Sequence, residues 1–122
     1  MIKGFFKNGS PAISLKIEGN ETELLLDTGF NGHLVLSNFM INKMKLKQMG
    51  FSDYMTASGE VKETNIYIAK LNLFDEEIEV PVLSTEGNFS LAGMDLFHNC
   101  RIIIERHNDL VEINKTKMSL EI

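Results

Sequence analysis

The residues best suited to chemistry in this sequence are Asp27, Thr28 and Gly29, which follow three consecutive leucines at 24–26. An aspartate in this position is carried out of a buried apolar strand into a turn. Gly29 permits tight backbone geometry in that turn, because glycine has no Cβ. A carboxylate held rigidly in this way is a candidate catalytic group.

Three other interpretations of this loop have to be compared with a catalytic one. Asp, Thr and Gly are all favoured in ordinary turns, and the tripeptide would occur by chance in roughly a few chains of this length in a hundred. A haloacid-dehalogenase-type phosphatase needs a second Asp where Gly29 stands. An actin-like ATPase needs a hydroxyl residue in place of Phe30 and a much longer chain. The ordinary turn is the interpretation that these residues leave open.

The residues before this loop predict a β-hairpin. Ile13, Leu15 and Ile17 alternate with polar residues, which is typical of a strand with one buried face. Gly19 and Asn20 then indicate a turn, and 21–26 is predicted to form a second strand whose leucine end is buried on both faces. This hairpin delivers Asp27.

The rest of the chain also predicts mostly strands. A short strand at 33–36 is followed by Ser37, a suitable N-cap for a short helix that carries Met40, Ile41 and Met44 and ends before Gly50. We expect a long hairpin from 51 to 73 with a polar tip at 57–60. Further elements are predicted at 78–83, 101–105, 110–113 and 118–122 as strands and at 95–99 as a second short helix.

The composition is that of an ordinary globular protein. A length of 122 residues fits one domain spanning 1–122, with 43% apolar and 24% charged residues. The net charge of -5 and the lack of a basic cluster argue against nucleic acid as a partner. Cys100 is alone, which excludes an internal disulfide, and the three histidines give no zinc-binding spacing. No apolar run suits a signal peptide or membrane span, so we expect a soluble cytoplasmic protein that does not bind membranes.

From Ile13 to Ile113 the sequence resembles the clan AA, retropepsin-like aspartic proteases, particularly their prokaryotic single-domain members. Residues 24–36 resemble the active-site loop of that family and include Asp-Thr-Gly-Phe, as in those members. Residues 57–59 resemble the tip of the family's flap, and 91–97 are similar to its late apolar-Gly-x-Asp-Leu-Leu segment. The resemblance implies a mainly β, single-domain, retropepsin-like acid protease barrel with one or two short helices.

The resemblance also implies a reaction and an assembly. Aspartic proteases hydrolyse peptide bonds with two carboxylates that share one proton, one acting as a base on water and the other as an acid toward the carbonyl. This chain has only one such loop, so the second carboxylate is expected to be Asp27 of another copy across a two-fold axis. The implied protein is therefore a homodimer that cleaves extended polypeptides without metal or cofactor.

Site residues next to Asp27 follow from the same resemblance. Thr28 is expected to form hydrogen bonds across the two-fold axis, and Gly29 to let the backbone approach the carboxylate and the substrate. Phe30 departs from the Ala or Ser of retroviral and pepsin-like enzymes, so hydroxyl support for the carboxylate is absent. Phe30 and Asn31 are expected to line the adjacent substrate subsite.

The predicted flap tip contains Ala57, Ser58 and Gly59, which would fold over a bound peptide and offer it backbone hydrogen bonds. An exposed hairpin turn of the same composition is the alternative interpretation. Asp95 is expected at a helix N-terminus, where free N–H groups and the helix dipole stabilise a carboxylate, and not in the catalytic pair.

Two functions are compatible with these observations. The first is an aspartic endopeptidase that uses paired Asp27 carboxylates. The alternative is a non-catalytic module that uses the same fold for dimerisation or peptide binding. The intact Asp-Thr-Gly sequence favours the endopeptidase, because a binding module has no need for a buried carboxylate pair that costs free energy.

Overall fold

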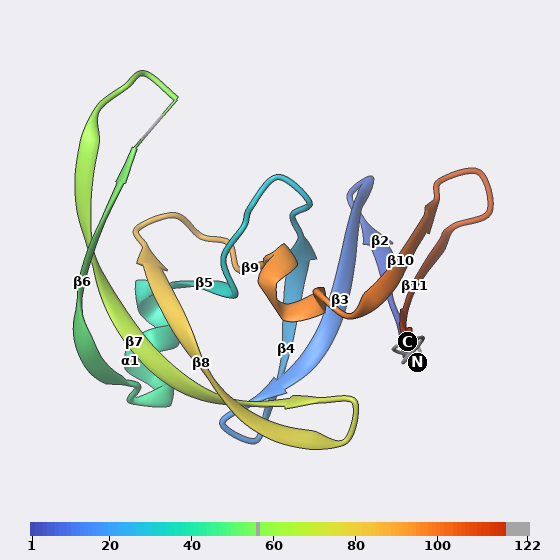
Figure 1. The fold of residues 1–122 in the computed structure, drawn as a ribbon, viewed down its shortest axis with the longest axis horizontal. Coiled ribbons are helices and arrows are strands. Elements are labelled where there is room, and N and C mark those ends of the chain that lie inside the picture. Colours follow the sequence, from blue (N-terminus) through green and yellow to red (C-terminus); the bar gives the residue numbers. More distant parts are fainter. Residues whose placement is uncertain (56, 117–122) are drawn as a thin grey trace, which may run out of the picture.

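The chain folds into a mainly β structure, which a computed structural model describes for residues 1–55 and 57–116 (Figure 1). The predicted class, mainly β with one or two short helices, is confirmed. The strand predicted at 118–122 lies outside the described residues. The strands are β1 (Ile2–Lys3), β2 (Phe5–Lys7), β3 (Ser10–Ile17), β4 (Asn20–Leu26), β5 (Leu34–Ser37), β6 (Lys47–Met55), β7 (Val61–Leu73), β8 (Glu76–Thr85), β9 (Leu91–Ala92), β10 (Cys100–Glu105) and β11 (Leu110–Lys115), with the helix α1 (Asn38–Met44) and the 3-10 helix η1 (Met94–Phe97).

The described strands form two sheets. The larger sheet has eight strands in the order β2-β3-β4-β9-β5-β8-β7-β6, and it curls so that Ile17 of β3 also pairs with Leu71 of β7. The smaller sheet has three strands in the order β1-β11-β10. In Figure 1 the long β6–β7 hairpin and the β10–β11 hairpin stand at opposite ends of the molecule. The loop that follows β4 lies between them.

The core is built by the alternation that the sequence predicts. Ile13, Leu15 and Ile17 of β3 are buried, whereas the polar residues between them are exposed. In β4, Leu24 and Leu26 are buried but Leu25 is partly exposed, so the prediction that all three leucines are buried is wrong for Leu25. Side chains along a strand alternate between its two faces, and the face that carries Leu25 is only partly covered. The two faces of β4 therefore differ in burial.

The helix α1 begins and ends as its sequence predicts. The Met40 N–H donates to Ser37 Oγ at 3.3 Å, so Ser37 is the N-cap, and Ile41 is the residue that α1 buries in the core. The helix ends at Lys45, which adopts a left-handed conformation with φ of 53° and whose N–H donates to carbonyls of the last turn. Within residues 1–55 and 57–116, no helix is long and apolar enough to cross a membrane.

Replacement of the helix cap gives a test of this local structure. Ser37→Ala removes the acceptor for the Met40 N–H, and we expect the free energy of unfolding to fall by about 1 kcal/mol. Ser14→Ala is the matched control, because Ser14 is exposed on β3. Urea denaturation of both variants measures the difference. An equal effect of the two substitutions would show that the cap contributes nothing.

Candidate active site

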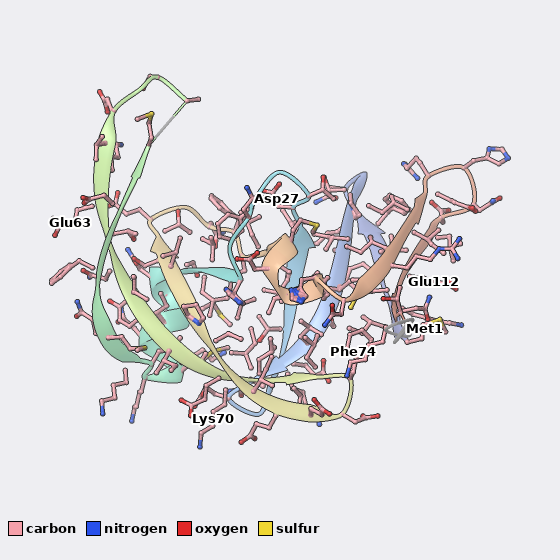
Figure 2. All side chains as sticks on the ribbon, viewed as in Figure 1. Met1, Asp27, Glu63, Lys70, Phe74 and Glu112 are labelled. Atoms are coloured by element: carbon pink, nitrogen blue, oxygen red, sulfur yellow. The ribbon has the colours of Figure 1, made fainter. Side chains whose placement is uncertain are left out.

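Asp27 is held in a tight turn directly after β4 (Figure 2). Its backbone N–H donates to the Ala92 carbonyl at 3.0 Å, which continues the parallel pairing of β4 with β9. Its carboxylate Oδ1 accepts a hydrogen bond from the Gly29 N–H at 3.0 Å, and its carbonyl accepts one from the Phe30 N–H at 3.2 Å. Both the backbone and the carboxylate of Asp27 therefore have a fixed orientation.

The loop from 27 to 33 is joined to the segment that contains β9 and η1. The strand β9 pairs in parallel with β4 and antiparallel with β5, so it lies between the two strands that flank the loop. Three backbone bonds continue this attachment beyond β9, from Gly93 N to His33 O at 2.8 Å, Met94 N to Phe30 O at 2.8 Å and Asp95 N to Gly32 O at 3.1 Å. The loop is thus bonded at several points to residues 60 or more positions later in the chain.

The Phe30 ring packs against its own loop. A Cβ placed on Gly32 would lie 2.3 Å from Phe30 Cζ, and a Cβ on Gly93 would lie 2.5 Å from Phe30 Cδ2 and 2.2 Å from the Gly32 carbonyl oxygen. Only glycine leaves room for the ring and the backbone at both positions. Phe30 therefore joins the loop to the η1 segment by packing, while its predicted contact with substrate stays a prediction.

One side of the loop is exposed to solvent in a single chain. Asp27 is half-buried, whereas Thr28, Gly29 and Asn31 are exposed. The Thr28 hydroxyl has no hydrogen-bond partner in the part of the chain that the structure describes. This arrangement leaves the carboxylate accessible from one side and the hydroxyl available to a further molecule.

The other predicted site residues lie on a different element. Ala57, Ser58 and Gly59 are exposed at the tip of the β6–β7 hairpin, and Gly59 has a φ of 86°, a conformation that favours glycine. In Figure 1 this tip and the loop after β4 both lie at the upper end of the molecule. The two groups of predicted residues thus come from separate elements at one end of the fold.

A hollow against β4 was not predicted from the sequence. Leu25, two positions before Asp27 on β4, shares this hollow with Phe89, whose side chain is 44% exposed. The exposed ion pair of Lys7 Nζ with Glu23 Oε1, at 2.7 Å, contributes to the same wall. Leu25 and Asp27 are two positions apart, so an extended chain would place their side chains on the same side. That spacing was a signal available in the sequence.

Asp95 and Cys100 lie outside the catalytic loop. Asp95 is exposed in the first turn of η1, and η1 has no side-chain cap. Cys100 is a free, partly buried thiol at the start of β10; burial raises its pKa, and the nearby Lys115 charge partly offsets that effect. In the described residues, no group of three His, Cys, Asp or Glu side chains is placed to hold a metal ion.

Comparison with known protein families identifies the family of the chain. The family described as "gag-polyprotein putative aspartyl protease" matches residues 13–99, which include the Asp27 loop and η1. The chain belongs to the retropepsin-like aspartyl protease family. The resemblance in the sequence is therefore confirmed. No curated protein has significant sequence similarity to the chain.

Solved structures share the retropepsin-like fold at low sequence identity. A retropepsin-like aspartic protease from Rickettsia conorii is 21% identical, with a TM-score of 0.68 over 94% of this chain and 89% of its own. The EIAV protease in complex with the inhibitor HBY-793 is 20% identical, with a TM-score of 0.62 over 73% and 86%. The simian foamy virus (mac) protease is 17% identical, with a TM-score of 0.51 over 68% and 87%. These similarities confirm the predicted retropepsin-like fold.

The packing of Phe30 on two glycines leads to a stability prediction. In Gly93→Ala the new Cβ would meet the Gly32 carbonyl and the Phe30 ring, so we expect the free energy of unfolding to fall by about 1–3 kcal/mol. Gly50→Ala is the control, because a Cβ at Gly50 has no neighbour within 4 Å. Chemical denaturation of both variants measures their free energies of unfolding. The packing argument is wrong if the two variants have equal stability.

Proposed function

We propose that this retropepsin-like protein is an aspartic endopeptidase, active as a homodimer with one Asp27 from each copy. The observation that supports it most directly is the half-buried Asp27 carboxylate, which is oriented by the Gly29 N–H on an otherwise exposed loop. The chain has one Asp-Thr-Gly loop, whereas the reaction uses two carboxylates. A two-fold axis beside Asp27 supplies the second one.

The reaction requires a water molecule between the two carboxylates. One Asp27, ionised, takes a proton from the water while the water oxygen bonds to the carbonyl carbon of the peptide. The partner's Asp27, protonated, gives its proton to the carbonyl oxygen. The first Asp27 then gives the proton it took from water to the nitrogen, and the C–N bond breaks to release an amine. One hydroxyl of the intermediate returns its proton to the partner's Asp27 as the carbonyl re-forms in the new carboxylic acid. Proton transfer between fixed groups needs the rigid orientation that the Gly29 N–H gives Asp27.

Thr28 and Phe30 have separate tasks in this proposal. The exposed Thr28 hydroxyl donates a hydrogen bond to the loop of the partner subunit and braces the pair of carboxylates. Phe30 has no hydroxyl to offer the carboxylate, but its ring supports the loop from behind through Gly32 and Gly93. Asn31, exposed beside it, is free to contact the substrate.

The substrate is an extended polypeptide held between the loop and the β6–β7 hairpin. The hairpin tip at Ala57, Ser58 and Gly59 acts as a flap that closes over the peptide and excludes water. The hollow formed by Leu25 and Phe89 receives an apolar side chain next to the bond that is cleaved. The Lys7–Glu23 ion pair adds a polar part to that wall.

The catalytic assignment is tested by Asp27→Asn. The amide cannot accept a proton from water, so we expect cleavage of an unfolded polypeptide to fall by at least about 10³-fold while the fold is retained.

The control for this experiment is Asp95→Asn, which changes an exposed carboxylate outside the loop. It is expected to keep wild-type activity. Cleavage that is equal in the wild-type protein and Asp27→Asn would refute the assignment. Peptide binding by a wild-type protein that leaves every substrate intact would favour the non-catalytic module.

The proposed role of Thr28 in bracing the dimer is tested by measuring activity as a function of protein concentration. Thr28→Ala removes an exposed hydroxyl that has no partner among the described residues, so protomer stability should change by less than about 0.5 kcal/mol. We expect the dimer to dissociate more readily, with activity lost at low protein concentration and partly regained at high concentration. Thr28→Ser keeps the hydroxyl and is expected to retain activity at both. Equal behaviour of the two variants would contradict the role.

A further inference from the structure

A second hollow continues the one that lies against Leu25. The two hollows share the loop residues 88–90 and, on β4, the side chain of Glu23. The second hollow extends beyond these shared residues to Glu21 of β4 and to Phe39 of α1, and we call it the outer groove. The hollow at Leu25 is therefore one end of a longer depression in the surface.

The outer groove follows β4 away from the Asp27 loop. Glu21, Glu23 and Leu25 alternate with buried residues, so they share the outward face of this strand. Glu21 stands six residues before Asp27, which corresponds to about 20 Å along an extended strand. A polypeptide that is bound at Asp27 in an extended form covers the same distance in about six of its own residues.

One wall of the outer groove is an aromatic ring that is exposed and yet held in place. The Phe89 side chain is 44% exposed, but a Cβ placed on Gly87 would lie 2.3 Å from Phe89 Cε1, so the ring lies against this glycine. The Gly87 N–H donates to Thr85 Oγ1 at 3.1 Å. The loop is joined to β4 by the Leu25 N–H, which donates to the Ser90 carbonyl at 2.9 Å. A ring fixed in this way loses little conformational entropy when it contacts a ligand.

The α1 side of the outer groove carries a second exposed phenylalanine. Phe39 is the second residue of α1, and its side chain is 71% exposed, whereas Ile41 of the same helix is buried in the core. Met40 beside it is partly buried and packs against the core. Aromatic side chains bury a large apolar area when they contact a partner. The Phe39 ring is therefore available to a ligand and is not needed by the core.

The charged side chains of the outer groove have opposite charges beside them in the chain. Lys7 Nζ forms an ion pair with Glu23 Oε1 at 2.7 Å. Lys16 lies directly opposite Glu21 across the β3–β4 hairpin, and opposite charges in such positions attract each other. The charges of the groove thus balance, and its two phenylalanine rings favour an apolar ligand group.

We propose that the outer groove is a remote binding site for the polypeptide substrate, and that it holds an aromatic or long aliphatic side chain about six residues from the bond that is cleaved. The inference rests on the proposed function, which places the substrate in the hollow at Leu25. The Phe39 and Phe89 rings contact the bound side chain from α1 and from the loop before β9. Each copy in the proposed homodimer has one such groove, so a substrate reaches a groove on either side of the cleaved bond.

Cleavage of a long and a short substrate by Phe39→Ala tests this site. Cuts made by the wild-type protein in β-casein, an unfolded polypeptide, are mapped first. Two peptides are then made around one cut, one of about eight residues and one of about 16, because only the longer one reaches the outer groove. We expect Phe39→Ala to raise KM for the long peptide at least about fivefold with kcat unchanged, since the groove binds substrate and transition state equally. The short peptide should be cleaved as by the wild type.

The matched control is Asn42→Ala, because Asn42 is exposed on the same helix and lines neither hollow. It is expected to keep the wild-type KM for both peptides, and both variants should keep the wild-type melting temperature. A rise in KM for both peptides, a rise for neither, or an equal rise in Asn42→Ala would each overturn the proposal.

A change in the substrate tests the chemistry of the site independently. Long peptides are made with either phenylalanine or serine about six residues from the cleaved bond, on each side in turn. The wild-type protein is expected to prefer phenylalanine by at least about fivefold in kcat/KM on at least one side, and Phe39→Ala to lose this preference, since the two changes remove the same contact. A preference that is absent in the wild type, or unchanged in Phe39→Ala, would refute the site.

Binding by the full chain with Asp27→Asn separates this inference from the catalytic proposal. In that background we expect Phe39→Ala to raise the Kd for β-casein at least about fivefold and Asn42→Ala to leave it unchanged. This result beside a wild-type protein that cleaves nothing supports the groove and refutes the catalytic function. Cleavage by the wild type with no effect of Phe39→Ala on Kd or KM refutes the groove and leaves catalysis standing.

Sedimentation of the same proteins tests the other possible occupant, a second copy of the chain. We expect Phe39→Ala and its parent to have the same oligomeric state at every concentration. If Phe39→Ala dissociates an assembly and leaves the Kd for β-casein unchanged, the groove is covered by another copy and the proposal is wrong.

Discussion

The structure depends on the backbone bonding between the Asp27 loop and the segment at 91–95. A loop that leaves a buried strand has polar backbone groups that must find partners. Here β9 lies between β4 and β5 and bonds to both, and η1 continues the attachment to Phe30 and Gly32. Because these partners are far apart in sequence, the carboxylate reaches its position only when the whole sheet is folded.

The same bonding explains the residue types around Asp27. At Gly93 two chain segments approach so closely that a Cβ would meet the Gly32 carbonyl, and at Gly32 a Cβ would meet the Phe30 ring. The large Phe30 ring fills the space that the two glycines leave. The large side chain at position 30 and the missing side chains at the two glycines therefore depend on each other. The chain lacks a hydroxyl at position 30, and packing contributes to the rigidity of the loop there.

The sequence predicts what depends on local patterns. Alternation identified β3, the turn at Gly19 and the leucine run identified β4, and Ser37 marked the start of α1, because these signals arise from neighbouring residues. Burial of Leu25 was predicted wrongly, since it depends on what covers the opposite face of β4. The packing of Phe30 against Gly93 could not be predicted, because these two residues are far apart in the sequence. The same is true of the hollow that Leu25 shares with Phe89.

A single Asp-Thr-Gly loop in each chain places a geometric condition on the proposed dimer. The two-fold axis has to pass beside Asp27, because both carboxylates must reach the same water molecule and a symmetric dimer has only one such axis. Within one copy, η1 bonds to the loop at Phe30 and Gly32. A displacement of η1 would therefore move the two carboxylates relative to each other. In this arrangement the segment that holds the loop within each copy also sets the spacing of the catalytic pair.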